Sequence, residues 1–532
     1  MNLHLSKKSI LKKTFQVGSL TLLSRILGII RETLQVRYFG VGAVSDAFIT
    51  AFKMPNFFRH VFAEGALSAS FVPAIVGSVK QGKQEESNGL MTLSFLFFEG
   101  IILLMYVGVL FNTEFIAKLI APGFSEEQIA YTIPFLRILF PFLLFISSSA
   151  LLAGALQAVN HFFAPAFGPS LMNMFYVVTL IGCLAYKLPP TVLCFGILMG
   201  GIAWMMMHVY FFIRKGFFFG AITPGAIKAF KNVLTKFLPC LFGVSIFEIN
   251  LFIGGMVASY LPQGSVSLLY YGSRFMNIPL GIFAVALSSI LLPHFSRTVL
   301  YAPKRLSFYL LEVTKLVSWV ILPATLYFLF VSRNFFEHVL LSKKATAFQI
   351  DQAVVILMIY IMGLWFFCMN KILLNLFYSM KDTWSSTIAS GVSAGVNVLG
   401  DLAWIYIFFK YDLTNVGPYG IAATAVLAGA TLSMGCFSFL KVRHQFTFYF
   451  GNFINFLWRY LVQLSMGTAL FYCIYSLAQC YFATTAWAQF FATGLGYWPL
   501  TGGLALAIML LMHRTKKIFG IKVYFLELKE VL

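Results

Sequence analysis

The chain has 532 residues, of which 60% are hydrophobic and 11% are charged, and its mean hydropathy is +0.85. These values are typical of an integral membrane protein and exclude an ordinary soluble domain. A net charge of +20 would fit a nucleic-acid-binding protein, but the cations gather in loops between apolar segments, so the charge indicates membrane topology and no nucleic-acid partner is expected.

Apolar runs of about 20 residues, the length that crosses a bilayer as a helix, recur along the chain. They predict an all-α polytopic membrane protein with about 14 transmembrane helices. The predicted spans cover 14–38, 43–77, 89–112, 130–157, 162–186, 190–213, 235–261, 265–296, 308–332, 351–379, 384–409, 418–440, 454–480 and 488–512.

The loops alternate in charge along this series of spans. Lysines and arginines precede the first span and follow the even-numbered ones, whereas most of the loop acids lie in the opposite set of loops. Because positively charged loops remain on the cytoplasmic side, both termini are predicted to be cytoplasmic. The first span continues through charged residues without a cleavage site, so it is interpreted as a membrane helix and not as a signal peptide.

Two stretches about 220 residues apart resemble each other. The segment AVSDAFITAFKMPNF (43–57), followed by GALSASFVP (65–73), parallels SVSLLYYGSRFMNIP (265–279) and VALSSILLP (285–293). This predicts a duplicated six-helix unit whose copies enter the membrane from the same side, so they form a parallel pseudo-twofold repeat with a cleft between the lobes. The predicted divisions are an N-terminal lobe at 1–220, a C-terminal lobe at 221–445, and two extra helices with a cytoplasmic tail at 446–532.

Four arginines occur inside predicted spans. Each costs about 2.5–3.5 kcal/mol at a bilayer centre, so all four are expected to face a shared hydrated cavity and not lipid. The guanidinium group pairs bidentately with phosphate oxygens, which favours an anionic, phosphate-bearing substrate. The alternative is a salt-bridge network with nearby acids that holds helices together. The arginines are Arg25, Arg31, Arg59 and Arg274, and the nearby acids are Glu32, Asp46 and Glu64.

Residues 46–73 closely resemble the MurJ/MviN family of lipid II flippases. Their sequence is DAFITAFKMPNFFRHVFAEGALSASFVP. This family lies in the superfamily of multidrug, oligosaccharidyl-lipid and polysaccharide exporters. The resemblance extends over essentially the whole chain. It continues through IAPGF (120–124), PAFGPSLMN (165–173), GSVSLLYYGSRFMNIPLGIFAVALSSILLP (264–293) and FYSMKDT (377–383).

The resemblance implies a flippase that carries lipid II, the undecaprenyl-diphosphate-linked disaccharide-pentapeptide, to the outer leaflet of the bacterial cytoplasmic membrane by alternating access. The four arginines match cavity positions of the family that engage the substrate head, and the last two helices resemble its groove for the polyprenyl tail. Polar positions around the same cavity are matched by Ser24, Asp46, Asn56, Glu64 and Ser267. One departure is Asn277, where some members carry an acid three residues after the last cavity arginine.

A second polar constellation lies in the C-terminal lobe. Asn397 and Asp401 are four residues apart and share one helix face, and Glu248 and Thr424 offer further oxygen ligands that suit a small cation. Some family members have a sodium site in this region. The rival interpretations are a proton carrier and a hydrogen-bonded helix contact. Lys371 in the tenth span would extend the cationic cavity.

Enzymatic function is not predicted, because the sequence contains no HExxH, P-loop or GxSxG motif. No resident cofactor is expected, and transport would be coupled to the membrane potential, sodium or protons. Expected partners are lipid II, membrane lipids and the cell-wall synthesis machinery. The alternatives are another lipid-linked oligosaccharide flippase, a drug exporter with fewer cavity cations, a polyprenyl-phosphate glycosyltransferase, or a membrane scaffold of cell-wall synthesis.

Overall fold

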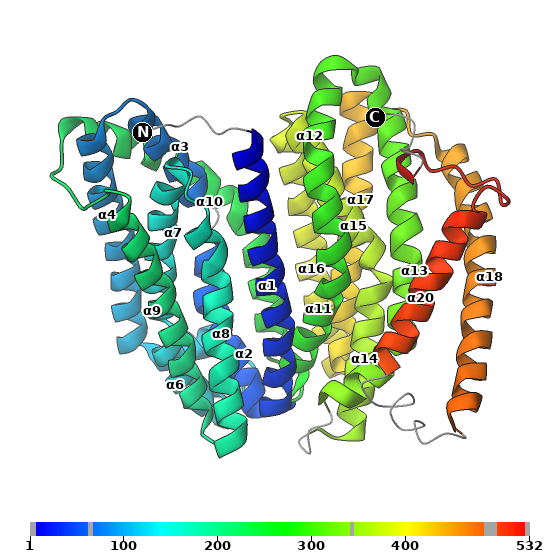
Figure 1. The fold of residues 1–532 in the computed structure, drawn as a ribbon. Helices are drawn as coiled ribbons and strands as arrows, with labels where there is room; N and C mark the ends of the chain where they lie inside the picture. Colours follow the sequence, from blue (N-terminus) through cyan, green and yellow to red (C-terminus); the bar gives the residue numbers. More distant parts are fainter. Residues whose placement is uncertain (1–6, 62–66, 341–344, 484–496, 527–532) are drawn as a thin grey trace. The chain divides into compact units, whose positions relative to one another are not determined.

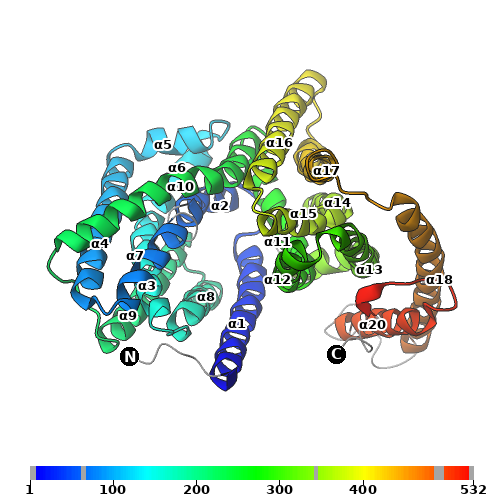
Figure 2. The ribbon, with the colours of Figure 1, turned by 90° about the horizontal axis from the view of Figure 1, so that it is seen from above.

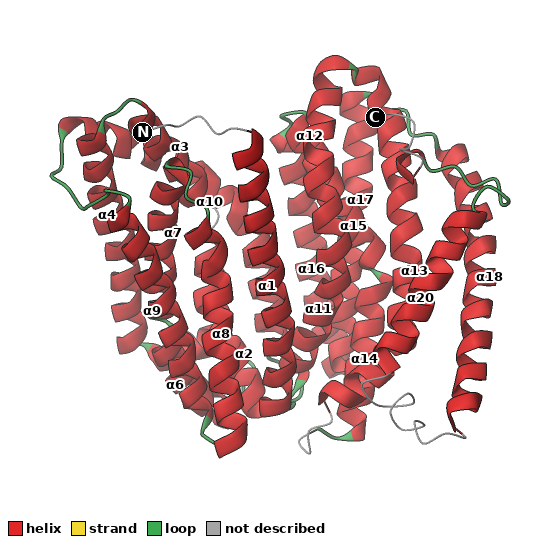
Figure 3. Ribbon diagram, in the orientation of Figure 1, coloured by secondary structure: helices red, strands yellow, loops and turns green. Residues whose placement is uncertain are grey.

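The computed structural model describes residues 7–61, 67–340, 345–483 and 497–526. Within these ranges the secondary structure is helical, with no strand, which confirms the predicted all-α class (Figure 3). Eight helices, including the joined pair at 126–158, are long and apolar enough to cross a membrane, and a pair bent by 42° gives a ninth span. Of the other predicted spans, 43–77 and 265–296 are each divided between shorter helices, 235–261 lies largely in the long helix that ends at Ala258, and part of 488–512 lies outside the described residues.

The chain forms two compact units, each described by itself below. Unit 1 is formed mainly by Met1–Tyr270 together with Asp401–Pro418, and unit 2 by Tyr271–Leu341, Thr346–Gly400 and Tyr419–Leu532. The predicted three-part division at 220 and 445 stays a prediction.

Unit 1 is a helical bundle in which α8 packs between α1 and α9, while α2 packs against α6 (Figure 1). The helix α10, predicted to open the second repeat, packs against α3 and α4. The bounds are α1 (Lys7–Phe39), α2 (Ala43–Phe58), α3 (Ser68–Lys80), α4 (Gln84–Phe111), α5 (Thr113–Ile120), α6 (Glu126–Leu139), α7 (Phe142–Ala158), α8 (Phe163–Tyr186), α9 (Pro190–Arg214) and α10 (Pro224–Ala258).

Local sequence signals explain where several of these helices begin and end. A capping box at Ser125 and Gln128 starts α6, and a proline at the first position starts both α9 and α10. The helix α7 ends at Ala158, and Asn160, two residues later, adopts the left-handed conformation with φ 60°. The second predicted span, 43–77, is divided: α2 passes Pro55 near its end and is followed by a π-helical stretch.

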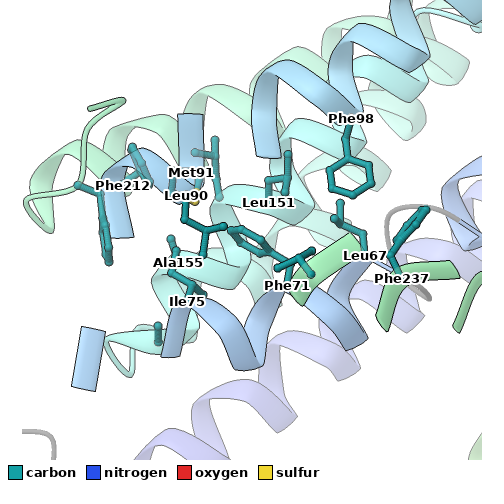
Figure 4. Close-up of a cluster of buried hydrophobic side chains, with 14 residues drawn as sticks. Leu67, Phe71, Ile75, Leu90, Met91, Phe98, Leu151, Ala155, Phe212 and Phe237 are labelled. Atoms are coloured by element: carbon teal, nitrogen blue, oxygen red, sulfur yellow. The ribbon is translucent and has the colours of Figure 1, made fainter. Parts of the chain in front are cut away.

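A cluster of buried apolar side chains joins α3, α4, α7 and α10 inside unit 1. Phe71 of α3 and Leu151 of α7 are 1% and 0% exposed and lie in the same cluster as Leu90 and Phe98 of α4 (Figure 4). Phe98 also lies 4.9 Å from Phe237 of α10, centroid to centroid. This packing explains why α10 belongs to unit 1.

Unit 2 has α13 at its centre, in contact with α14, α15 and α18, and α20 packs along α18 (Figure 2). The helix α11 begins in unit 1 and continues into unit 2. The bounds are α11 (Ser265–Leu280), α12 (Ala286–Tyr301), α13 (Leu306–Leu340), α14 (Ala347–Met362), α15 (Leu364–Ser379), α16 (Thr383–Tyr411), α17 (Gly417–His444), α18 (Phe450–Ala483) and α20 (Tyr497–Thr515).

The turn between α15 and α16 in unit 2 is fixed by Asp382. Its carboxylate accepts hydrogen bonds from the Ser385 backbone N–H at 3.1 Å and the Ser385 hydroxyl at 2.7 Å, which caps α16. From the end of α17, His444 Nε2 lies 2.7 Å from Asp382 Oδ2, and Arg443 lies 3.5 Å from Oδ1. Burial alone would raise the pKa of Asp382, but these hydrogen bonds and the Arg443 charge outweigh it and lower the pKa to about 2.

Close contact between α8 and α9 predicts that Gly168→Ala destabilises the protein. A Cβ atom at Gly168 would lie 2.1 Å from Nε1 of the Trp204 indole, and such overpacking costs about 1–3 kcal/mol. Gly182→Ala in the same helix is the matched control, because in the described chain its Cβ position has no atom within 4 Å apart from its sequence neighbours and the nearby backbone of its own helix. Thermal midpoints from fluorescence-detected size exclusion should fall for Gly168→Ala only. Equal midpoints for the two variants would contradict the packing.

The lowered pKa of Asp382 predicts a pH-dependent contribution to stability. A carboxyl whose pKa falls from 3.8 to about 2 on folding stabilises the protein fully above 3.8 and loses this effect as the pH falls through about 2. The free energy of unfolding lost in Asp382→Asn should therefore be larger at pH 5 than at pH 3. Ser386→Ala, whose hydroxyl bonds only to Thr383 O of its own helix, should show no such trend. A pH-independent loss in Asp382→Asn would refute the assignment.

Candidate functional site

Arg31 of α1 is held by contacts with α8 and with its neighbour Glu32. Its Nη1 donates to Asn173 Oδ1 of α8 at 2.9 Å, and its Nη2 pairs with Glu32 Oε1 at 2.5 Å. The guanidinium carbon also lies 5.1 Å from the centroid of the Tyr176 ring, a cation–π distance. The side chain is 14% exposed, so the charge is held against α8 and shielded from most of its surroundings.

Asn173 extends this arrangement to a second predicted site residue. Its Nδ2 donates to Ser24 O at 3.1 Å and lies 3.4 Å from the Ser24 hydroxyl. Between Ser24 and Arg31, Gly28 would place a Cβ 3.9 Å from the same nitrogen, so a small residue leaves room for the amide. Asn173 is the last residue of the segment PAFGPSLMN (165–173), and the sequence alone predicted no role for it.

Arg25 lies on the same helix with a different environment. Its side chain is exposed, whereas Arg31 is partly buried, and α1 continues through Gly28 as an α-helix. Arg25 retains the exposure that a ligand-facing residue requires.

Arg59 follows the C-terminal end of α2. Its Nε donates to Asn56 Oδ1 at 3.1 Å, and its Nη2 lies 2.9 Å from His60 Nε2. Asn56 in turn donates to Phe52 O at 2.9 Å, so two predicted site residues, Asn56 and Arg59, are in direct contact. Glu64, predicted as part of the same site, lies outside the described residues.

Asp46 and Ser267, which the sequence predicted beside the arginines, meet at the N-terminus of α11. Asp46 Oδ2 accepts from Gly264 N at 2.6 Å and Oδ1 accepts from Ser267 N at 2.8 Å, while Gln128 of α6 donates at 3.2 Å. Asp46 is 1% and Ser267 0% exposed. The carboxylate thus satisfies backbone N–H groups at a buried helix end. Their predicted place beside the arginines stays a prediction.

The remaining cations of the predicted site belong to unit 2. Arg274 of α11 and Lys371 of α15 are both exposed. Asn277 donates to Ser273 O at 2.9 Å, so the amide that replaces an acid in this chain bonds within its own helix. The gathering of Arg274 and Lys371 with the unit 1 arginines in one cavity stays a prediction.

The predicted cation-site residues occupy three helices. Asp401 is fully buried, and its Oδ2 lies 3.5 Å from the Cβ position of Gly254 in α10, the helix that also holds Glu248. Asn397 is 7% exposed, and the Thr424 hydroxyl donates to Ile421 O at 2.9 Å. The described part of the chain contains no group of three or more His, Cys, Asp or Glu residues that could hold a metal ion.

Comparison with known proteins adds family information to this geometry. A family model described as lipid II flippase MurJ matches residues 35–493. A probable lipid II flippase MurJ of Rhizobium meliloti is 32% identical over 441 residues, covering 79% of this chain and 78% of the relative. One from Vibrio cholerae is 30% identical over 425 residues, covering 75% of this chain and 78% of the relative.

Solved structures show the same fold. A lipid II flippase MurJ in an inward closed conformation gives a TM-score of 0.76 at 24% identity and covers 94% of this chain and 99% of its own. An inward-facing multidrug resistance MATE family transporter of the MOP superfamily gives a TM-score of 0.68 at 14% identity, covering 78% of this chain and 94% of its own. Both matches concern the fold alone.

The buried capping of α11 predicts that Asp46→Ala is strongly destabilising. The substitution leaves the N–H groups of Gly264 and Ser267 without their carboxylate, and hydrogen bonds to a charged acceptor contribute about 1.5–3 kcal/mol each. Ser267→Ala is the milder comparison, because it keeps both N–H donors and removes the hydroxyl, which bonds to Gly264 O and to the Asp46 carboxylate. Equilibrium unfolding in mixed micelles should show a loss of about 3 kcal/mol for Asp46→Ala and about 1 kcal/mol for Ser267→Ala. Similar losses would contradict the capping role.

Proposed function

The chain belongs to the lipid II flippase MurJ family, and we propose that it moves lipid II from the inner to the outer leaflet of the bacterial cytoplasmic membrane. The family match over residues 35–493 carries this assignment. The family is one of transporters, so we infer that the chain supplies a passage and catalyses no covalent reaction. Its role is then to deliver the peptidoglycan precursor for cell wall biogenesis.

The physical task explains the intramembrane arginines. A disaccharide-pentapeptide with a diphosphate cannot cross hydrocarbon unaided, because desolvating its charges and amides costs several kcal/mol for each group. Arg25, Arg31, Arg59 and Arg274 are proposed to hold the diphosphate and sugar head in a hydrated cavity. Arg31 is already oriented by Asn173 and Glu32, so little side-chain freedom is lost when it meets a phosphate.

The last two helices are proposed to hold the polyprenyl tail. The helices α18 and α20 pack along each other and keep large apolar side chains exposed, among them Met466 and Leu477 of α18 and Leu506 and Leu510 of α20. Such side chains suit an acyl or prenyl chain. The head would then move through the protein while the tail stays on its apolar exterior.

Net direction requires coupling to a gradient. A membrane potential supplies about 2.3 kcal/mol per elementary charge per 100 mV, so a cycle that carries charge can be driven by it. Sodium or proton coupling through Glu248, Asn397, Asp401 and Thr424 is proposed as the second possibility for the same step. We also propose that both termini face the cytoplasm and that cell-wall synthesis enzymes receive the product.

The experiment is complementation of a strain whose resident lipid II flippase can be depleted. Arg31→Ala, Arg59→Ala and Arg274→Ala should each lower outer-leaflet lipid II at least tenfold at equal membrane abundance, since each removes charged hydrogen bonds of about 1.5–3 kcal/mol. Arg31→Lys keeps the charge without the bidentate geometry and should retain part of the activity. Arg214→Ala, which alters an exposed arginine bonded to Tyr210 at the end of α9, is the control.

Two results would overturn parts of the proposal. Full rescue by equally abundant Arg31→Ala, Arg59→Ala and Arg274→Ala would make these arginines structural. Failure of the parent chain, present at normal abundance in the depleted strain, would contradict lipid II as its substrate.

A further inference from the structure

A small basic hollow lies in unit 1, away from the intramembrane arginines. Its volume is about 300 Å³, and it is enclosed by the start of α1, the loop between α7 and α8, and the residue after α9. The polar and charged residues that line it are Lys13, Gln16, Asn160, His161 and Lys215, and none of the lining residues is acidic. By the predicted topology, this hollow lies at the cytoplasmic surface of the membrane.

The loop between α7 and α8, which lines this hollow, is held by backbone hydrogen bonds. His161 N donates to Leu156 O and Asn160 N to Gln157 O, both at 2.9 Å, which closes α7 with Asn160 in the left-handed conformation. Lys13 Nζ donates to Asn160 O at 2.8 Å and lies 5.8 Å from the centroid of the Phe162 ring. The first lysine is therefore positioned before any ligand arrives.

His161 contributes a second feature to the lining of the hollow. Its ring stacks 4.6 Å from Phe211, and its Nε2 is buried without a hydrogen-bond partner in the described chain. Burial first, and then the charges of Lys215 and Lys13, lower the pKa of the imidazole. A buried ring nitrogen without a partner costs free energy unless a ligand or water bonds to it.

These features match the phosphate group of a lipid. Two lysines, an imidazole and two amide side chains without a neighbouring carboxylate favour a compact anion, and 300 Å³ is near the lower limit of ligand pockets, which accommodates a head group only. Phe162 and Phe163 belong to the lining, and Phe15 of α1, 80% exposed, lies between Lys13 and Gln16 in sequence. Acyl chains therefore have an apolar surface beside the basic hollow.

We propose that Lys13, Asn160, His161 and Lys215 form a binding site for the phosphate of an anionic membrane phospholipid, separate from the intramembrane arginines. The site anchors the start of α1 to the head-group layer. The proposal does not depend on which substrate the protein transports, because it requires only that unit 1 is in a membrane.

The test is native mass spectrometry of the purified full-length protein titrated with phosphatidylglycerol or with diacylglycerol of the same acyl chains. The parent should bind phosphatidylglycerol about tenfold more tightly than diacylglycerol, and Lys13→Gln/Lys215→Gln should remove most of this difference. Lys13→Arg/Lys215→Arg restores both charges and should bind within a few-fold of the parent. Lys228→Gln/Lys231→Gln, which removes two exposed charges from α10 on the same predicted side, should bind as the parent does.

Three outcomes would overturn the proposal. The first is equal affinity of the parent for the two lipids. The second is unchanged phosphatidylglycerol binding by a correctly folded Lys13→Gln/Lys215→Gln variant, or an equal loss in the α10 control. The third is displacement of the lipid by inorganic phosphate at comparable concentration, which would assign the site to soluble phosphate in place of a lipid.

Discussion

A charged side chain inside a membrane needs a partner, and the contact between α1 and α8 is organised around this requirement. A lone arginine at a bilayer centre costs about 2.5–3.5 kcal/mol. Arg31, whose side chain is 14% exposed, is paired with Asn173 on α8 and with Glu32 on its own helix. Because Asn173 also bonds to Ser24, the polar contacts span two turns of α1 and fix its register against α8. The position of Arg31 is therefore a property of the packed pair of helices.

Backbone N–H groups also need hydrogen-bond partners where a helix begins in a buried position. The N–H groups of Gly264 and Ser267 at the start of α11 are satisfied by the carboxylate of Asp46, which comes from a different helix. In unit 2, the Asp382 carboxylate caps the start of α16. Arg443 and His444 also contact this carboxylate. Acids thus serve mainly as helix caps at these two places.

Apolar runs predicted the helices well where a span is continuous and uncharged. The predicted span 190–213 corresponds closely to α9 (Pro190–Arg214), because proline at its start and arginine at its end mark the limits. The predicted span 43–77 is divided, since Pro55 disrupts the helical hydrogen bonds near the end of α2. The sequence singles out the four arginines because a charge in an apolar run is conspicuous, and their shared cavity stays a prediction. Asn173 was assigned no role, because a neutral amide in a helix gives no comparable signal and its partner is 142 residues away.

The pairing of Arg31 with Glu32 bears on how a flippase can release what it binds. Four uncompensated guanidiniums would hold a diphosphate tightly in both leaflets, and tight binding in every state does not produce turnover. A carboxylate 2.5 Å from Arg31 competes with the phosphate for the same N–H donors, so it lowers affinity while keeping the guanidinium in place. Arg25, on the same helix, is exposed where Arg31 is partly buried, so it is the more accessible of the two to an incoming head group. On the proposed function, α1 thus combines a residue suited to capture with one suited to orientation and release.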